Sequence, residues 1–214
     1  MISICIASLP ERLSMLESTI ESLRVQCDKF YVALNNYQSI PDFLKDDDVV
    51  IRDNKMGDAE RYYCIDKIEG YIFTCDDDLI YPKNYVEYMI DGIKKYNSAV
   101  TLHGKTYDKP VFDEPLGIYR CLDDVDSDGR VNVGGTGVMA WHSDLLKVKY
   151  SDFKIRNMAD LWFSKLCKEQ GVRIMCLAHT KDNLIYQFPE HTIWHEEKGK
   201  GFVEQNKVLK MFIS

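Results

Sequence analysis

The sequence predicts an α/β fold in three layers, with a mostly parallel central sheet between two layers of helices. Short runs of bulky and β-branched residues alternate four times with helix-like segments within about the first 95 of the 214 residues. This alternation is typical of strand–helix–strand units that build parallel sheets with right-handed crossovers. One run, at residues 71–75 (Tyr-Ile-Phe-Thr-Cys), carries no charge, which indicates a strand buried on both faces.

The predicted strands in the first half of the chain are residues 2–7, 29–34, 49–52, 71–75 and 99–104. Apolar residues at positions 13, 16, 20 and 23, and again at 86, 89, 90 and 93, recur at the spacing of one helical face. Pro82 marks the start of the second of these helices. Gly57 followed by Asp58, a residue suited to an N-cap, predicts a further helix from Asp58 to about Ile68.

Residues 105–130 form a polar segment, in which Asp128-Gly129 predicts a hairpin turn. The acidic run at residues 123–129 opens like an EF-hand loop, but Gly135 stands where that loop needs a bidentate Glu, which excludes calcium. Residues 131–141 return to a strand that Gly134, Gly135 and Gly137 interrupt. These glycines would let a ligand approach the backbone closely, or they mark a plain β-bulge.

The last predicted elements are a helix and a strand. The helix has an apolar face and ends at Gly171, and the strand covers residues 172–178. Asp160 lies in the first turn of the helix, where capping alone would also explain an acidic residue. The tail at residues 191–201 holds two histidines with nearby lysines and glycines, a combination that could bind an anion or a metal.

Length and composition favour one domain over residues 1–214. The net charge of −7 argues against a general nucleic-acid binder. The seven cysteines form no C-x-x-C pair and are expected to be reduced and buried. We expect no signal peptide and no transmembrane segment, and therefore a cytoplasmic location.

The acidic triplet Asp76-Asp77-Asp78 follows the buried strand directly. Three adjacent anions repel one another unless a cation or hydrogen-bond donors share their position. Because α/β sheets bind ligands beyond the carboxyl ends of their strands, and because carboxylates suit Mg²⁺ or Mn²⁺, the triplet indicates a divalent metal site that bridges to phosphates. The alternative is that it only caps the helix that begins near Lys83.

In this order, the segments resemble the nucleotide-sugar glycosyltransferases with the GT-A fold, over nearly the whole chain. Asp76-x-Asp78 matches the D-x-D element of that family, residues 57–61 precede the acidic strand, Gly135-Thr136-Gly137 follows it, and Asp160 and His195 come later. Residues 76–85 are especially similar to a bacterial and viral subgroup that makes surface polysaccharides. The chain is also similar to leading glycosyltransferase domains of large multidomain proteins of algal (chlorella) viruses.

The resemblance implies a nucleotide-binding half at about residues 1–105 and a half at about 106–214 that completes the acceptor and metal sites. It also implies a role for each matching residue. The loop from Ser8 to Arg12 would contact the nucleotide base, with Asn35 where many relatives have an Asp. Asp58 and Arg61 would face the base or the diphosphate. Asp76 and Asp78 would bind the metal together with His195, or with His191 in its place. The remaining contacts to the nucleotide sugar would come from Asp77, Gly135, Thr136, Lys198 and Lys200.

The resemblance also implies a reaction. A metal-dependent enzyme would transfer a sugar from a nucleoside-diphosphate sugar, with UDP as the expected nucleotide, to a glycan hydroxyl, and the host cytoplasm would be its location if the chain is viral. If Asp160 is the general base, the reaction inverts the anomeric centre; Asp152 and Asp144 remain alternatives. Two other functions stay open. They are a nucleotidyltransferase that makes the sugar nucleotide, although residues 8–12 have no glycine, and a silent sugar-binding module of the same fold.

Overall fold

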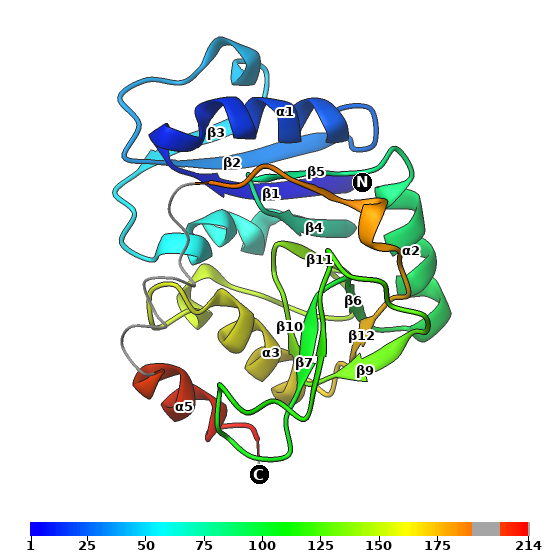
Figure 1. Cartoon of the computed structure of the whole chain (residues 1–214). Coiled ribbons are helices and arrows are strands. Elements are labelled where there is room, and N and C mark those ends of the chain that lie inside the picture. Colours follow the sequence, from blue (N-terminus) through cyan, green and yellow to red (C-terminus); the bar gives the residue numbers. More distant parts are fainter. Residues whose placement is uncertain (190–201, 214) are drawn as a thin grey trace.

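The computed structural model describes residues 1–189 and 202–213 (Figure 1). Its strands are β1 Ile2–Ser8, β2 Lys29–Asn35, β3 Asp48–Arg52, β4 Tyr71–Cys75, β5 Leu79–Ile80, β6 Ala99–Thr101, β7 Gly104–Thr106, β8 Gly117–Tyr119, β9 Gly129–Val131, β10 Val133–Gly134, β11 Val138–His142, β12 Ile174–Cys176 and β13 Ile185–Tyr186. Its helices are α1 Leu13–Leu23, α2 Tyr85–Tyr96, α3 Ala159–Glu169 and α5 Val203–Leu209.

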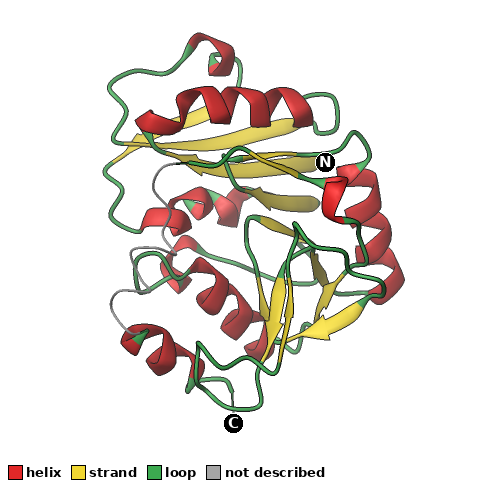
Figure 2. Cartoon of the chain, viewed as in Figure 1, coloured by secondary structure: helices red, strands yellow, loops and turns green. Residues whose placement is uncertain are grey.

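The described residues form a main sheet of eight strands in the order β3-β2-β1-β4-β11-β6-β12-β9. Strands β1, β2, β3 and β4 pair in parallel, as do β6 and β12, whereas β11 runs antiparallel to both of its neighbours, β4 and β6. The predicted α/β fold with a mostly parallel sheet is therefore confirmed. Figure 2 shows helices on the two sides of this sheet.

The core lies on both faces of the sheet. Helices α1 and α2 pack on one face, against alternate residues of β1 such as Ile4 and Ile6. Helices α3 and α5 and the segment after Gly57 pack on the other face, against Cys5 and Trp141. The strand β4 is buried on both faces as predicted, since Phe73, Thr74 and Cys75 are fully buried. The cysteines in the described part of the chain are free, and most of them are buried, as expected.

The predicted helix from Asp58 to Ile68 is wrong. This segment instead forms two short 3₁₀ helices, Gly57–Tyr62 and Ile65–Lys67. Glu60 is fully buried, where its carboxylate accepts hydrogen bonds from the Met56 N–H at 2.9 Å and from the Tyr150 hydroxyl at 2.8 Å, and it also pairs with Arg52. Because Glu60 contacts Met56 shortly before it and Tyr150 far from it in the sequence, the backbone forms tight 3₁₀ turns here and no α-helix.

The predicted hairpin turn at Asp128-Gly129 is also wrong. Gly129 begins β9, which pairs with β12 rather than with the preceding strand β8. The carboxylate of Asp128 accepts hydrogen bonds from Lys95 at 2.9 Å and from the Ala178 N–H at 2.7 Å, so it joins α2 to the segment after β12. The predicted strand at 99–104 is divided between β6 and β7, which belong to different sheets.

In the described residues no helix has the length and apolar character that crossing a membrane requires.

Candidate functional site

The site begins where three parallel strands end at the same edge of the sheet. Ser8 ends β1, Asn35 ends β2, and Asp76 follows β4. Because β11 runs antiparallel to β4, its first residue Val138 lies opposite Cys75, and the preceding glycine segment reaches the same edge. The Asp76 N–H donates to the Gly137 carbonyl at 3.0 Å. Segments about 60 residues apart in the sequence therefore meet beside the acidic triplet.

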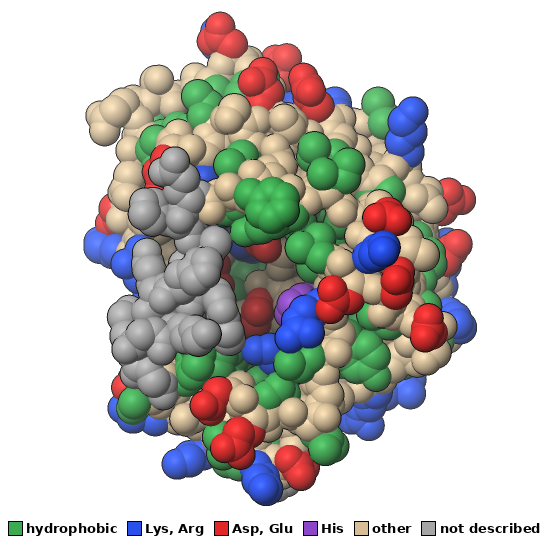
Figure 3. Space-filling view, in the orientation of Figure 1, with side chains coloured by type: hydrophobic (Ala, Val, Ile, Leu, Met, Phe, Trp, Pro, Cys, Tyr) green, Lys and Arg blue, Asp and Glu red, His purple; other side chains and the backbone are tan. Residues whose placement is uncertain are grey.

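Two cavities open at this edge. The strand-end cavity, of about 470 Å³, is lined by the polar residues Ser8, Glu11, Arg12, Asn35, Asp58, Arg61, Asp76, Asp77, Asp78 and Arg156, among others. The α3 cavity, of about 320 Å³, is lined by Gly135, Thr136, Asp160, Phe112, Phe202 and Gln205, among others. Asp58, Arg61, Asp76 and His103 line both cavities, so the two are continuous. Figure 3 shows a hollow in this face with acidic, basic and histidine side chains gathered in it.

Arg12, in the segment that follows β1, faces the acidic triplet. The Arg12 Nη1 atom donates to Asp77 Oδ1 at 2.8 Å and to Asp78 Oδ2 at 3.2 Å. Burial, and then the neighbouring charges of Asp76 and Asp77, raise the pKa of Asp78 to about 7 although Arg12 opposes this. The alternative of simple helix capping is wrong, because β5 and residues 81–84 separate the triplet from α2.

Arg61 is a buried connector between three segments of the site. Its Nε donates to the Asp58 carbonyl at 3.0 Å, and its Nη1 donates to the Cys75 and Thr136 carbonyls at 3.2 and 3.1 Å. Its Nη2 donates to Asp76 Oδ1 at 2.8 Å, and Arg61 is only 5% exposed. The guanidinium therefore positions Asp76 and the glycine segment relative to each other.

Asp58 does not act as the N-cap of a helix that follows it. Its Oδ2 atom instead accepts a hydrogen bond from the Ala159 N–H, at the start of α3, at 3.2 Å. Its Oδ1 atom is buried without a hydrogen-bond partner among the described residues. Burial raises the pKa of Asp58 to about 7, with Arg61 opposing the shift and Asp160 adding to it. Asp58 therefore joins the strand-end cavity to the first turn of α3.

Whereas Arg12 lines the strand-end cavity, Asp160 lines the α3 cavity. Its Oδ1 atom accepts hydrogen bonds from the Thr136 N–H at 2.7 Å and from the Thr136 hydroxyl at 2.6 Å. These bonds fix the carboxylate, while Oδ2 makes no hydrogen bond to the residues that the structure describes. Asp152 and Asp144 line neither cavity. The geometry thus favours Asp160 over these two alternatives as the carboxylate that faces a substrate.

The glycines before β11 make room for side chains of the chain itself. A Cβ atom at Gly137 would lie 1.9 Å from Asp76 Oδ2, and one at Gly135 would lie 2.9 Å from the Cβ of His103. The sequence allowed two interpretations of these glycines, the close approach of a ligand or a plain β-bulge. The structure shows a close approach to the backbone, and the groups that make it are the side chains of Asp76 and His103.

His103 and Phe202 are site residues that the sequence interpretation did not identify. His103 follows β6, and burial lowers the pKa of its imidazole while the charge of Lys105 acts in the same direction. Its position just after a buried strand is a signal of the same kind as that of Asp76. Phe202 precedes α5 and lies 5.0 Å from the Phe112 ring, and Asn206 of α5 accepts a hydrogen bond from the Phe112 N–H at 2.7 Å. No local motif indicates this contact.

The carboxylate oxygens around the acidic triplet are suited to binding a divalent cation. Among the described residues, five carboxylates but only three guanidinium groups line the strand-end cavity. Carboxylate oxygens are ligands that Mg²⁺ and Mn²⁺ accept, and Asp76 and Asp78 would hold the ion. Among residues 1–189 and 202–213, no three His, Cys, Asp or Glu side chains form a complete metal-binding group. The predicted third ligand His195, its alternative His191, and the predicted phosphate contacts Lys198 and Lys200 lie outside the described residues.

No protein-family model matches the chain, and no curated protein sequence matches it. Its fold is similar to that of S. aureus TarS, a GT-A-like glycosyltransferase, residues 1–349 of which were crystallised in complex with UDP-GlcNAc. The TM-score is 0.55 at 14% identity, over 89% of this chain and 59% of the TarS chain. A second TarS 1–349 structure gives a TM-score of 0.53 at 12% identity, over 84% and 58%. The chain thus spans less than two thirds of the TarS chains.

Proposed function

We propose that the chain is a glycosyltransferase that transfers a sugar from a nucleoside-diphosphate sugar, with UDP as the nucleotide, to the hydroxyl of a glycan acceptor. The observation that carries this proposal is the continuous cavity at the strand ends, where Arg12, Asp77 and Asp78 line one part, Asp160 lines the other, and Arg61 and Asp76 line both. The fold shared with TarS, whose crystallised complex holds UDP-GlcNAc, supports a donor of this class.

The strand-end cavity would bind the donor. Departure of the sugar builds negative charge on the diphosphate, and stabilising that charge is the main demand on the enzyme. A divalent cation held by Asp76 and Asp78 would neutralise part of this charge when bound. Arg12 lies against Asp77 and Asp78 and would supply a second positive group beside the diphosphate. Ser8 and Asn35, at the ends of β1 and β2, would contact the nucleoside.

The α3 cavity would bind the acceptor. Asp160 lines it and is oriented by both hydrogen bonds from Thr136, which leaves Oδ2 to accept the proton of the attacking hydroxyl. Attack from the side of Asp160, opposite the departing diphosphate, is a single displacement that inverts the anomeric centre. Phe112 and Phe202 form an aromatic wall of this cavity, suited to the less polar face of a sugar ring.

Asp160→Asn tests the assignment of the base. The variant is expected to bind donor as the wild type does and to lower transfer by about 10²-fold or more. Asp152→Asn is the matched control, since Asp152 lines neither cavity. Donor binding is measured by isothermal titration calorimetry and transfer or slow donor hydrolysis by release of UDP. Turnover at the wild-type rate in Asp160→Asn would remove this residue from the mechanism.

Asp78→Ala tests the metal and the donor together. We expect it to abolish Mn²⁺-dependent stabilisation by UDP-sugars in a thermal-shift screen, because a bound ligand raises apparent stability with the logarithm of its concentration over Kd. The exposed substitution Asp91→Ala is the control. A wild-type protein that binds no UDP-sugar with or without Mn²⁺ would contradict the proposed function.

We further propose that the reaction serves surface-polysaccharide or glycoprotein glycan synthesis in the cytoplasm, as in the bacterial and viral subgroup that the sequence resembles.

A further inference from the structure

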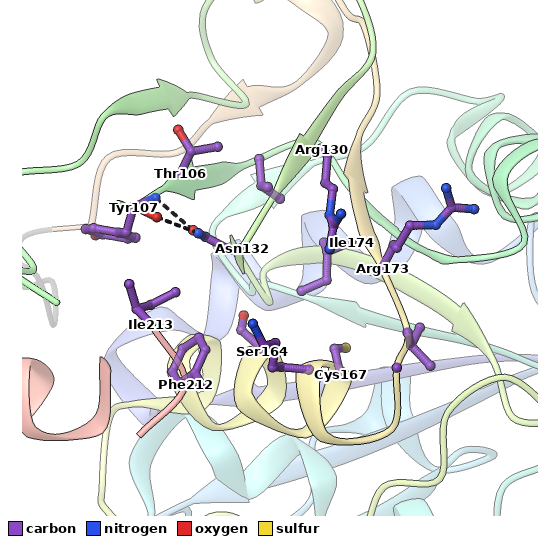
Figure 4. A pocket seen from close by; sticks show the side chains of 14 residues that line it. Thr106, Tyr107, Arg130, Asn132, Ser164, Cys167, Arg173, Ile174, Phe212 and Ile213 are labelled. Carbon is purple, nitrogen blue, oxygen red and sulfur yellow. Dashed lines mark hydrogen bonds between the residues drawn. The ribbon is translucent and has the colours of Figure 1, made fainter. Parts of the chain in front are cut away.

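A separate cavity of about 420 Å³ lies toward the other end of α3. Its wall combines residues around β7, β9 and β12, the second half of α3, and Phe212 and Ile213 near the end of the chain (Figure 4). None of its described lining residues lines the strand-end cavity or the α3 cavity. Lys168 is eight residues after Asp160 on α3, a distance of about 12 Å along the helix. We call it the β9–α3 cavity.

The neutral polar side chains of this cavity are already paired. Asn132 accepts a hydrogen bond from the Tyr107 N–H at 2.9 Å and donates one to the Tyr107 carbonyl at 2.8 Å, as the dashed lines in Figure 4 show. The Ser164 hydroxyl accepts from the Gly134 N–H at 3.0 Å and donates to the Asp160 carbonyl at 2.6 Å. These groups shape the cavity but have little capacity left for a ligand.

The remaining polar groups are cationic. Arg130, Lys168 and Arg173 line the cavity and are exposed, and no Asp or Glu is among the lining residues that the structure describes. None of the three forms an ion pair with a carboxylate of the described residues. Arg173 donates to the Tyr96 carbonyl at 2.8 Å and keeps further N–H groups, and Arg130 lies opposite Met175 in the pairing of β9 with β12. In a chain of net charge −7, this group of three cations among the described lining residues creates a local field that favours anions.

The floor of the cavity is apolar. Val131, Ile174, Phe212 and Ile213 are buried, and the buried ring of Tyr107 adds an aromatic surface. In Figure 4, Phe212 and Ile213 face the cavity from below Tyr107, next to Ser164. A bare ion would use only the rim, whereas a ligand with an anionic group on a partly apolar body would use both the rim and the floor.

We propose that the β9–α3 cavity is a second binding site, for a phosphate or carboxylate group carried on a sugar-sized body. Arg130 and Lys168 hold the anion, Arg173 adds charge, and the apolar floor contacts the body. Guanidinium and ammonium groups form charge-assisted hydrogen bonds with such oxyanions. The site does not depend on the proposed transfer reaction, because it shares no lining residue with the joined cavities.

The test uses the whole chain, labelled with ¹⁵N, in titrations with glucose 6-phosphate, glucuronate, inorganic phosphate and glucose. We expect saturable amide shifts at residues 130–132, 164–168 and 171–174 with the anionic sugars and none there with glucose. Tighter binding of glucose 6-phosphate than of inorganic phosphate identifies a sugar-borne anion as the ligand. Equal binding of the two identifies free phosphate and overturns the role of the apolar floor.

The variant Arg130→Gln/Lys168→Gln is expected to weaken glucose 6-phosphate binding at least tenfold, and both positions are exposed, so the fold should survive. Lys165→Gln, which removes one charge from α3 outside the cavity, should change the affinity less than twofold. Shifts confined to residues 8–12 and 76–78 would place the anion in the strand-end cavity and overturn the proposal. Equal affinity of the wild type and the double variant would overturn it as well. Neither result would bear on donor binding measured with UDP-sugars.

Discussion

Replacing Asp58 by Asn is expected to make the protein more stable above pH 7 and to change its stability little near pH 4. Burial raises the pKa of Asp58 from an ordinary 3.8 to about 7 in the folded protein. The fold therefore favours the protonated carboxyl. The stability that this preference supplies is complete below about pH 3.8 and is lost as the pH rises through about 7. Asn resembles the protonated form at every pH and should keep the hydrogen bond from the Ala159 N–H.

The size of the effect follows from the difference between the two pKa values. A difference of about three pH units corresponds to about 4 kcal/mol, which is an upper limit, because local relaxation and water entry reduce it. We expect the unfolding free energy of Asp58→Asn, relative to that of the wild type, to rise by about 2 kcal/mol between pH 4.5 and pH 8.5. The buried Oδ1 atom, which has no hydrogen-bond partner in the described structure, is the reason that ionisation is costly there.

The assay is urea unfolding, followed by tryptophan fluorescence, at several pH values across this range. Asp91→Asn is the matched control, because Asp91 is on the exposed side of α2 and has a side chain that is 70% exposed. The difference in unfolding free energy between Asp58→Asn and the wild type should grow with pH, and that for Asp91→Asn should stay flat. If the plots of unfolding free energy against pH for Asp58→Asn and the wild type are parallel, Asp58 is not held protonated by its surroundings.

Two further substitutions test how the site is assembled. Arg61→Met removes four hydrogen bonds that join three segments, and we expect it to lower the unfolding free energy by about 3 kcal/mol or more. The control Arg120→Met loses only a surface ion pair and should lower the unfolding free energy by less than about 1 kcal/mol in the same denaturation assay. If the two variants lower the unfolding free energy by similar amounts, Arg61 is not a connector. Gly137→Ala places a Cβ atom 1.9 Å from Asp76 Oδ2, so Asp76 must move. We expect loss of Mn²⁺-dependent UDP binding by calorimetry with the fold retained, while Gly117→Ala should bind normally.

The parts of the fold that the sequence predicted correctly are those that depend on local patterns. Residues 71–75 are apolar and uncharged because both faces of β4 are covered, and the same reasoning identified β1 and β2. The position of Asp76 beside Ser8 and Asn35 followed from a general property of parallel sheets, whose strands end at one edge. Asp160 was placed correctly in the first turn of its helix.

The parts that were missed depend on partners far away in the sequence. The carboxylate of Glu60 meets Tyr150, and Asp128 meets Lys95 and Ala178. No spacing within residues 57–68 or 123–129 reveals these contacts, and the local patterns there favoured a helix and a hairpin. Phe202 and Gln205 reach the α3 cavity only because α5 packs against α3. The roles of Asp76, Asp78 and Asp160 in binding and catalysis stay predictions until the variants are measured.

The place of β11 in the main sheet constrains how the molecule can be divided. Strands β4 and β6 both belong to the first 105 residues, yet they are not neighbours, since β11 from residues 138–142 lies between them. A fragment that ends near residue 105 would carry a sheet with one strand missing from its middle, and β4 and β6 would each present unpaired backbone groups there. During synthesis, the corner that holds Asp76 can therefore close only after residues 137–142 have emerged from the ribosome, because Gly137 and Val138 complete it.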